Sequence, residues 1–243
     1  MPAKRGLLHA QVGINLSTDA VGKPISLSPD IWYGVNEKLT VGLVHTGVGT
    51  TGVQGLPGAS LCLTGSDNGC GDFYSNVGLD ARYTLKSSEK LQLALDAGLF
   101  VNSLDPFQLS IKVGVAGRYK LGKQLALEFQ PSVFFGVTER DGGGQVDAET
   151  NKETIVAPVN FVYGLNEKVG LLGQVALILP LEDTGDAYLL GLSLGGSYAI
   201  NKQLSLELIF SLPVLVTGAK DTNGDSIGGV DARSLTLGGS YAF

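Results

Sequence analysis

Six tyrosines close alternating apolar stretches, and this series constrains the fold more than any other feature of the chain. They are Tyr33, Tyr83, Tyr119, Tyr163, Tyr198 and Tyr241. The first five are followed by a short polar turn, such as NEK or NKQ, and then by a new alternating stretch. Six equivalent strand ends predict six β-hairpins, and hence twelve strands whose first and last members end on the same side.

The stretches between the tyrosines alternate strictly between apolar and polar or small residues. Residues 91–102 (LQLALDAGLFVN) show this clearly, and residues 107–121 and 125–137 repeat it. Because successive side chains of a β-strand point to opposite faces, each stretch has one apolar and one largely polar face. The pattern predicts strands near residues 6–16, 25–35, 39–48, 73–85, 91–103, 108–121, 125–137, 153–165, 169–181, 187–200, 204–217 and 230–243.

The number of strands decides which way the apolar face points. A barrel of about eight strands is filled by side chains, whereas barrels of about 16–18 strands enclose aqueous channels. Twelve strands would pack an apolar interior poorly, but they can turn the apolar face outward to lipid while closure pairs every backbone group. We therefore predict an all-β fold: a single closed antiparallel transmembrane β-barrel that spans residues 1–243 as one domain. A soluble two-sheet β protein is the alternative.

Composition fits an apolar outer surface and excludes other classes. The chain is 44% hydrophobic but only 16% charged, with a mean hydropathy of +0.20. Soluble domains carry about a quarter charged residues. No run of about 18 apolar residues is present, which excludes a helical membrane span. A net charge of −6 and a pI near 4.9 argue against nucleic acid as a partner.

The end of the sequence, TLGGSYAF, places a glycine, an aromatic residue and a phenylalanine at characteristic spacing. With the tyrosine series, it resembles the C-terminal β-signal of bacterial outer-membrane β-barrel proteins, carried here by Gly238, Tyr241 and Phe243. The resemblance implies a place in the outer membrane, recognition by the barrel-assembly machinery, and a tyrosine girdle near the periplasmic rim. It does not single out a subfamily with a defined substrate.

Two further features bear on the compartment. The start, MPAKRGLLHAQVG, is basic but lacks the apolar core of a secretory signal, so we expect that an initiator methionine has replaced the natural signal. Cys62 and Cys70 share one glycine-rich stretch and favour a local disulfide in an oxidising compartment. A metal site would need more ligands, and no histidine lies nearby in sequence.

Eight charged residues fall on the predicted inward face of the barrel. They are Asp30, Asp80, Arg82, Asp96, Lys112, Arg118, Glu128 and Glu207. Two interpretations stay open. The charges either form mixed-sign rings that narrow a pore and shape the field that solutes meet, or form internal salt bridges that fill space.

The other predicted inward wall is less polar. It comprises Val156, Pro158, Val162, Leu172, Ile178, Pro180, Leu189, Ile209, Pro213 and Leu215. This wall would either bind apolar solutes or be packed shut. Trp32, Tyr74, Phe100 and Phe134 also point inward, where filling the lumen is favoured over a track for sugars.

Catalytic and metal chemistry have little support. Only His9 and His45 could serve as bases, and we expect His45 on the outward face near the loop end, as a rim residue without a partner acid. Residues 221–231 space Asp221, Asn223, Asp225 and Asp231 like a calcium loop, but they lack its glycine and terminal glutamate. Ordinary turn chemistry explains them as well. No enzyme, cofactor or metal is predicted.

The function predicted from these patterns is passive diffusion of small solutes or ions through a narrow, charge-lined lumen, in a monomer or weak oligomer. One alternative is a closed structural barrel whose long connections, at residues 49–72, 138–152 and 218–229, bind ligands or partners. The other is a transporter of apolar solutes. Residues 49–72 are the connection most expected to fold inward.

Overall fold

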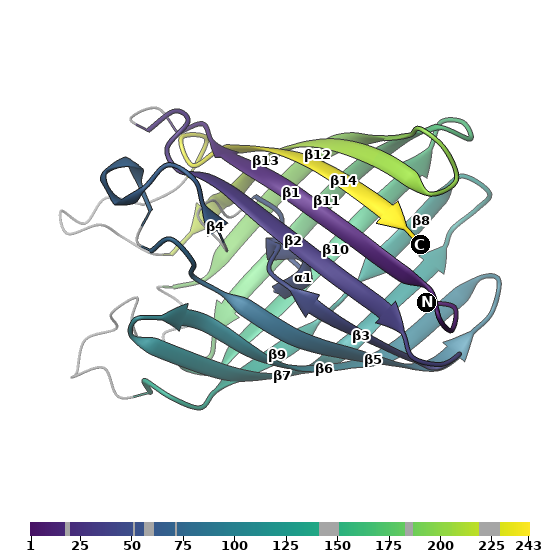
Figure 1. The fold of residues 1–243 in the computed structure, drawn as a ribbon, viewed down its shortest axis with the longest axis horizontal. Helices are drawn as coiled ribbons and strands as arrows, with labels where there is room; N and C mark the ends of the chain where they lie inside the picture. Colours follow the sequence, from purple (N-terminus) through teal and green to yellow (C-terminus); the bar gives the residue numbers. More distant parts are fainter. Residues whose placement is uncertain are drawn as a thin grey trace.

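The computed structural model describes residues 1–17, 20–50, 52–55, 61–70, 72–140, 151–182, 187–218 and 229–243. Its strands form one antiparallel sheet, and β1 pairs with both β14 and β2, so that the sheet closes into a barrel (Figure 1). The predicted closed antiparallel β-barrel is confirmed.

Twelve strands make up the barrel wall, one of them in two pieces. They are β1 (Gly6–Asn15), β2 (Ile25–Gly34), β3 (Leu39–Val44), β5 (Val77–Ser87), β6 (Leu91–Leu104), β7 (Phe107–Lys120), β8 (Leu125–Phe129) with β9 (Ser132–Gly136), β10 (Thr154–Gly164), β11 (Val169–Pro180), β12 (Leu189–Ala199), β13 (Leu204–Thr217) and β14 (Ser234–Ala242). The short strand β4 (Leu61–Cys62) pairs with the first residues of β2, and η1 (Ser66–Asn68) is a 3₁₀ turn that follows it in the chain.

The wall is broken between β8 and β9 at Gln130 and Pro131. Proline has no N–H to donate to a neighbouring strand, so it interrupts the ladder. Both pieces nevertheless pair with β7 and β10, and the Pro131 carbonyl accepts a hydrogen bond from Val115 N at 3.0 Å. The predicted strand at 125–137 therefore forms with a local irregularity.

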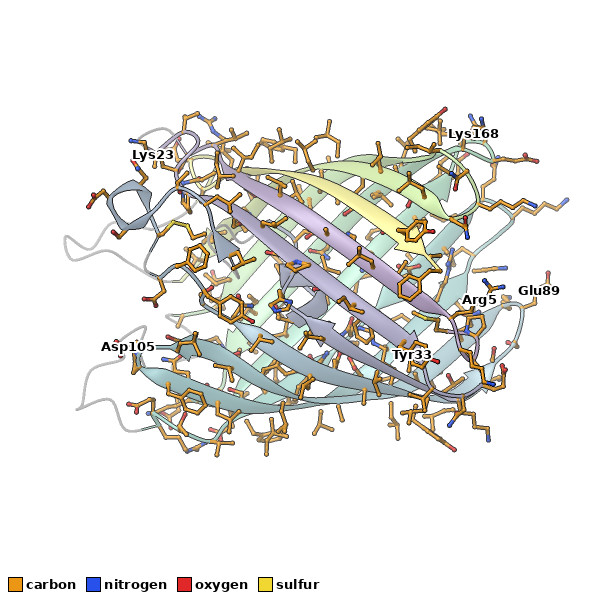
Figure 2. The ribbon with its side chains drawn as sticks, in the orientation of Figure 1. Arg5, Lys23, Tyr33, Glu89, Asp105 and Lys168 are labelled. Atoms are coloured by element: carbon orange, nitrogen blue, oxygen red, sulfur yellow. A yellow bond between two sulfur atoms is a disulfide. The ribbon has the colours of Figure 1, made fainter. Side chains whose placement is uncertain are left out.

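The outer face of the wall is apolar and exposed. It includes Leu79 (61% exposed), Leu99 (51%), Val113 (51%), Leu194 (61%) and Leu208 (49%). Figure 2 shows such side chains projecting around the barrel. Water disfavours a continuous apolar belt, whereas a bilayer requires one, so the barrel is a transmembrane structure. None of the described helices has the length and apolar character of a membrane-spanning helix.

β1 and β14 pair along their length, and the two ends of the chain lie at the same end of the barrel (Figure 1). Gly6 N donates to the Phe243 carbonyl at 2.9 Å, and Phe243 N donates to the Gly6 carbonyl at 3.0 Å. The Tyr241 and Phe243 rings stack with centroids 6.3 Å apart. The last residue therefore completes the closure, and we call this end of the barrel the tyrosine end.

Candidate functional site in the barrel lumen

The structure places all eight predicted charged residues on the inside of the barrel. Asp30, Asp80, Asp96 and Lys112 are almost fully buried. Arg82, Arg118, Glu128 and Glu207 line a central cavity, as does Asp30. The eight residues separate into groups with different surroundings.

Four of the charges form a compact cluster on β5, β6 and β7. Lys112 Nζ lies 3.0 Å from Asp80 Oδ2 and 2.8 Å from Asp96 Oδ2. Arg82 Nε lies 3.6 Å from Asp96 Oδ1, and its Nη2 lies 3.8 Å from Asp80 Oδ2. Gln130 joins the cluster by accepting from Arg82 Nη2 at 3.1 Å and donating to Asp96 Oδ2 at 2.7 Å. For these residues, which we call the charge cluster, the structure shows the internal salt bridges that buried charges require.

A glycine on the middle strand makes this cluster possible. Gly98 on β6 stands opposite Asp80 on β5 and opposite Lys112 on β7. A Cβ at Gly98 would lie 2.9 Å from Asp80 Oδ1 and would collide with the Phe100 ring. The empty position therefore lets an aspartate and a lysine meet although a whole strand separates them.

Aromatic side chains pack around the charge cluster. The Arg82 guanidinium lies 4.3 Å from the Trp32 ring centroid, and Lys112 Nζ lies 5.3 Å from that of Phe100. Phe100 meets Phe134 edge to face, with centroids 5.4 Å apart. Trp32, Phe100 and Phe134 form one buried group with Val44, Val53, Val156 and Ala176. They fill space beside the charge cluster, and Trp32 also lines the central cavity.

The chain turns into the lumen directly after β3, and residues 45–50 and 52–55 form what we call the inward segment. It contains the short helix α1 (Gly47–Thr50), which Figure 1 shows inside the barrel. The Asp30 carboxylate accepts hydrogen bonds from His45 N (2.7 Å), Thr46 N (2.9 Å) and Thr46 Oγ1 (2.5 Å). Thr46 Oγ1 in turn accepts from Gly49 N at 2.7 Å, as an N-terminal helix cap does. Asp30 thus anchors the start of the segment.

The inward segment is also anchored to the far wall. Gln174 Nε2 on β11 donates to the Gly52 carbonyl at 2.7 Å, and its Oε1 accepts from Gln54 N at 2.8 Å. Ser234 Oγ on β14 donates to the Gly55 carbonyl at 2.8 Å. Gly52 and Gly55 have φ angles of 79° and 83°, which favour glycine. The segment therefore crosses the lumen, and the inward folding predicted within residues 49–72 is confirmed for residues 52–55.

The expected position of His45 is wrong. It was expected on the outward rim, but it is buried. Because β3 ends at Val44, His45 leaves the alternation and turns inward; Nδ1 donates to the Pro29 carbonyl at 2.5 Å, and Nε2 lies 2.8 Å from Tyr74 Oη. Burial raises the pKa of the Tyr74 phenol, which keeps it a proton donor to that nitrogen.

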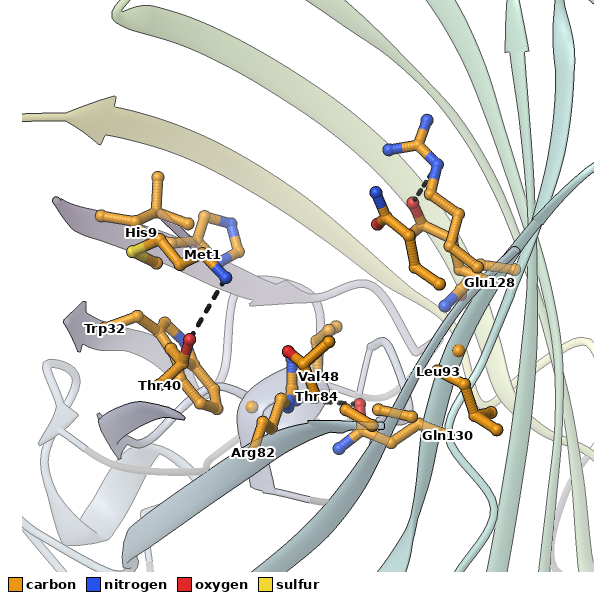
Figure 3. Close-up of a pocket in the computed structure, with 18 of the residues that line it drawn as sticks. Met1, His9, Trp32, Thr40, Val48, Arg82, Thr84, Leu93, Glu128 and Gln130 are labelled. Atoms are coloured by element: carbon orange, nitrogen blue, oxygen red, sulfur yellow. Dashed lines mark hydrogen bonds and ion pairs between the residues drawn. The ribbon is translucent and has the colours of Figure 1, made fainter. Parts of the chain in front are cut away.

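A cavity of about 820 Å³ lies between the tyrosine end and the inward segment (Figure 3). Its lining runs from Thr84, Gln92 and Ser240 to Val48 and Gly49 of the inward segment. It contains a more exposed ion pair than those of the charge cluster. Arg118 Nε lies 3.4 Å from Glu128 Oε1, and these side chains are 45% and 39% exposed.

A third group of polar residues lies on β1 and β13. Glu207 Oε1 lies 3.0 Å from His9 Nε2 and accepts from Gln11 Nε2 at 2.8 Å. Gly238 stands on β14 between Glu207 and Gln11, and a Cβ there would collide with the Glu207 carboxylate. Gly238, predicted as part of an assembly signal, therefore also makes room for a polar contact inside the barrel.

Part of the predicted apolar wall lies inside the barrel. Val156 and Pro158 are buried, and Pro158 packs against Gly52. Val162, Leu172 and Ile209 line a smaller cavity of about 160 Å³, together with Val48 of the inward segment. This cavity lies beside the polar groups of Asn160, Gln174 and Glu207.

The predicted disulfide joins Cys62 and Cys70, with Cα atoms 5.9 Å apart. Five tyrosines of the series, Tyr33, Tyr83, Tyr163, Tyr198 and Tyr241, are exposed on the outer face, and Tyr119 is half-buried. Of the calcium candidates, Asp221, Asn223 and Asp225 lie outside the described residues, whereas Asp231 lies within them. The part of the chain that is described holds no group of three or more acidic, histidine or cysteine side chains suited to a metal ion.

Several residues of the site were not singled out from the sequence. Thr46, Gln11, Gln130 and Gln174 hold the inward segment or the buried charges in place. Gln11 and Gln174 occupy inward positions of β1 and β11, so strand periodicity could have identified them, whereas Gln130 lies at the break between β8 and β9. Thr46 lies outside any strand, and no periodic signal marks it.

Comparison with protein-family models and with curated proteins gave no match. Solved structures are similar over nearly the whole chain. A KdgM porin in complex with disordered oligogalacturonate has a TM-score of 0.60 at 8% identity, with 98% of this chain and 99% of that chain covered. An outer-membrane channel from Pseudomonas putida F1 has a TM-score of 0.62 at 11% identity, with 100% and 97% covered. The chain therefore has the fold of bacterial outer-membrane porins and channels, and its exposed apolar belt is the surface that this location requires.

Proposed function

We propose that the barrel is an outer-membrane channel through which small solutes or ions diffuse passively. The cavity of about 820 Å³ inside the wall carries this proposal, because it gives solutes a polar, charge-lined space at the tyrosine end. Similarity in fold to a porin and to an outer-membrane channel supports it.

Passage beyond this cavity is narrow. The inward segment crosses the lumen between Asp30 and Gln174, and the buried aromatic group fills space beside it. A solute entering from the tyrosine end meets the Arg118–Glu128 pair and Glu207 before it meets Val48. The mechanism is diffusion past fixed charges that favour or oppose each ion, without a chemical step.

Planar-bilayer recordings of the purified protein test this function. We expect small discrete conductance steps, and opposite changes in ion selectivity from two neutralising variants. Arg118→Gln leaves Glu128 unpaired and should increase the selectivity for cations, whereas Glu128→Gln should increase the selectivity for anions. The reversal potential in a salt gradient measures both changes. Thr84→Ala, which removes an uncharged hydroxyl from the same cavity, is the control. Inserted, folded protein that carries no current would contradict the proposal.

A closed structural barrel is the second candidate. It is favoured by one observation: the inward segment and the group around Phe100 and Phe134 occupy the lumen near the loop end. In that case the tyrosine-end cavity would be a blind vestibule. The same recordings separate the two functions, because a blind vestibule passes no ions.

We also propose that the barrel-assembly machinery recognises the end of β14. Tyr241 is 44% exposed and Phe243 is 51% exposed on the outer face, where a binding partner can reach them before the membrane does. Backbone hydrogen bonds between Phe243 and Gly6 close the seam between the first and last strands. The machinery would thereby bind β14, the strand whose pairing with β1 closes the barrel.

A further inference from the structure

The charged side chains of this chain are divided unequally between the two ends of the barrel. Among the described residues, the connections at the loop end contain seven acidic and four basic residues. The tyrosine end has nine basic residues against three acidic ones, Glu37, Glu89 and Glu167. The remaining charges of the described residues are the eight inside the lumen.

Each of the five turns at the tyrosine end contributes at least one lysine. These are Lys38, Lys90, Lys123, Lys168 and Lys202, and Lys86 and Lys120 lie at the adjoining ends of β5 and β7. Lys4 and Arg5 precede β1 at the same end. We call these residues the basic ring. Figure 2 shows Arg5 and Lys168 at one end of the barrel and Lys23 and Asp105 at the other.

The side chains of the basic ring are available to a ligand. All of them are exposed. Within the described residues none forms an ion pair; the ion pairs present involve other cations. Among the described residues, one member of the basic ring has a cation–π contact: Lys90 Nζ lies 5.4 Å from the centroid of the Tyr119 side chain. Like charges gathered around one end of the barrel repel one another, which raises the electrostatic free energy unless counter-ions bind there.

Turn geometry holds part of the ring at the level of the membrane surface. In the turns after Tyr33 and Tyr163, the side-chain oxygen of an asparagine accepts from two backbone N–H groups, one of them that of Lys38 or Lys168. Exposed Val35 and Leu165 follow directly after β2 and β10, so that each of these lysines lies just beyond apolar surface. Long lysine side chains in this position extend toward headgroups.

We propose that the basic ring binds the anionic headgroups of phospholipids in the leaflet at the tyrosine end. Lysines beside a membrane surface attract anionic lipids, and the attraction falls within a Debye length. The ring surrounds the barrel, so it contacts the lipids next to the wall rather than one lipid in a pocket. The acidic connections at the other end would repel the same headgroups, so the interaction also favours one orientation.

Spin-labelled lipids reconstituted with the full chain test this proposal. Spin-labelled phosphatidylglycerol and phosphatidylcholine are compared in phosphatidylcholine bilayers, and the fraction immobilised by the protein is measured for each. We expect phosphatidylglycerol to be preferred by about fivefold at low salt, with the preference falling at high salt.

Two quadruple variants distinguish charge from turn structure. Lys38→Gln, Lys123→Gln, Lys168→Gln and Lys202→Gln together remove four of the nine cations of the basic ring and should lower the preference to about half, whereas arginine at the same four positions should preserve it. Lys23→Gln, at the opposite end, should leave it unchanged. Equal immobilisation of both lipids by the natural chain would overturn the proposal, and so would a full preference in the glutamine variant. The result is independent of whether the channel conducts.

Discussion

The charge cluster and the Arg118–Glu128 pair are both ion pairs inside one barrel, but their surroundings differ. Lys112 is fully buried between Asp80 and Asp96, and the Trp32 and Phe100 rings pack against the cluster. Arg118 and Glu128 lie on β7 and β8 in the open cavity, roughly half exposed. Burial makes the first group necessary for the structure, because a charge that loses its partner there cannot be solvated. Exposure leaves the second group free to act on passing ions.

The largest effect that follows from this contrast is expected from Lys112→Met. The variant leaves two buried carboxylates with Arg82 as the only cation of the charge cluster beside them, and breaking such a pair costs about 3–5 kcal/mol. We expect lower resistance to chemical unfolding, measured by the loss of the compact, heat-modifiable form on gels. Adding Asp80→Asn should restore part of the stability. A variant as stable as the natural chain would show that the cluster is not needed.

An intermediate effect is expected at the anchor of the inward segment. Asp30→Ala removes three hydrogen bonds to His45 and Thr46, two of them backbone donors, at a cost of about 1–3 kcal/mol for the groups left unpaired. The released segment should open the lumen, so single-channel conductance should rise and become noisier. Ser26→Ala, four residues earlier on β2 and also buried, is the matched control. Unchanged conductance would mean that the segment does not limit passage.

The smallest effect on stability is expected in the open cavity. Arg118→Gln should lower the free energy of unfolding by less than about 1 kcal/mol, because solvent screens a half-exposed pair. The same unfolding titration measures it beside Lys112→Met. If both variants lost equal stability, burial would not decide how much an ion pair contributes to the stability of this barrel.

Strand positions and facing were predictable because alternation is a local property. A side chain two residues along a strand returns to the same face, so placing Tyr119 outward also places Arg118 inward. The predicted strands 91–103 and 204–217 agree closely with β6 and β13, whereas β3 ends four residues before the predicted strand 39–48, and β5 and β14 each begin four residues late. Alternation does not determine where a side chain points once the residue lies outside a strand, and His45, which follows β3, is the clearest case.

The sequence by itself determined the class of barrel, the strand number and the inward position of the eight charges, because each depends on period-two patterning and on turn residues. Only the tertiary structure decided which charges meet. Asp80 and Lys112 are brought together by register across three strands, with Gly98 left empty between them. The path of the inward segment was likewise decided by distant partners, Asp30, Gln174 and Ser234, whose contacts depend on closure of the whole wall. The tyrosine series counts strands, whereas the contacts inside the barrel arise only when those strands are joined.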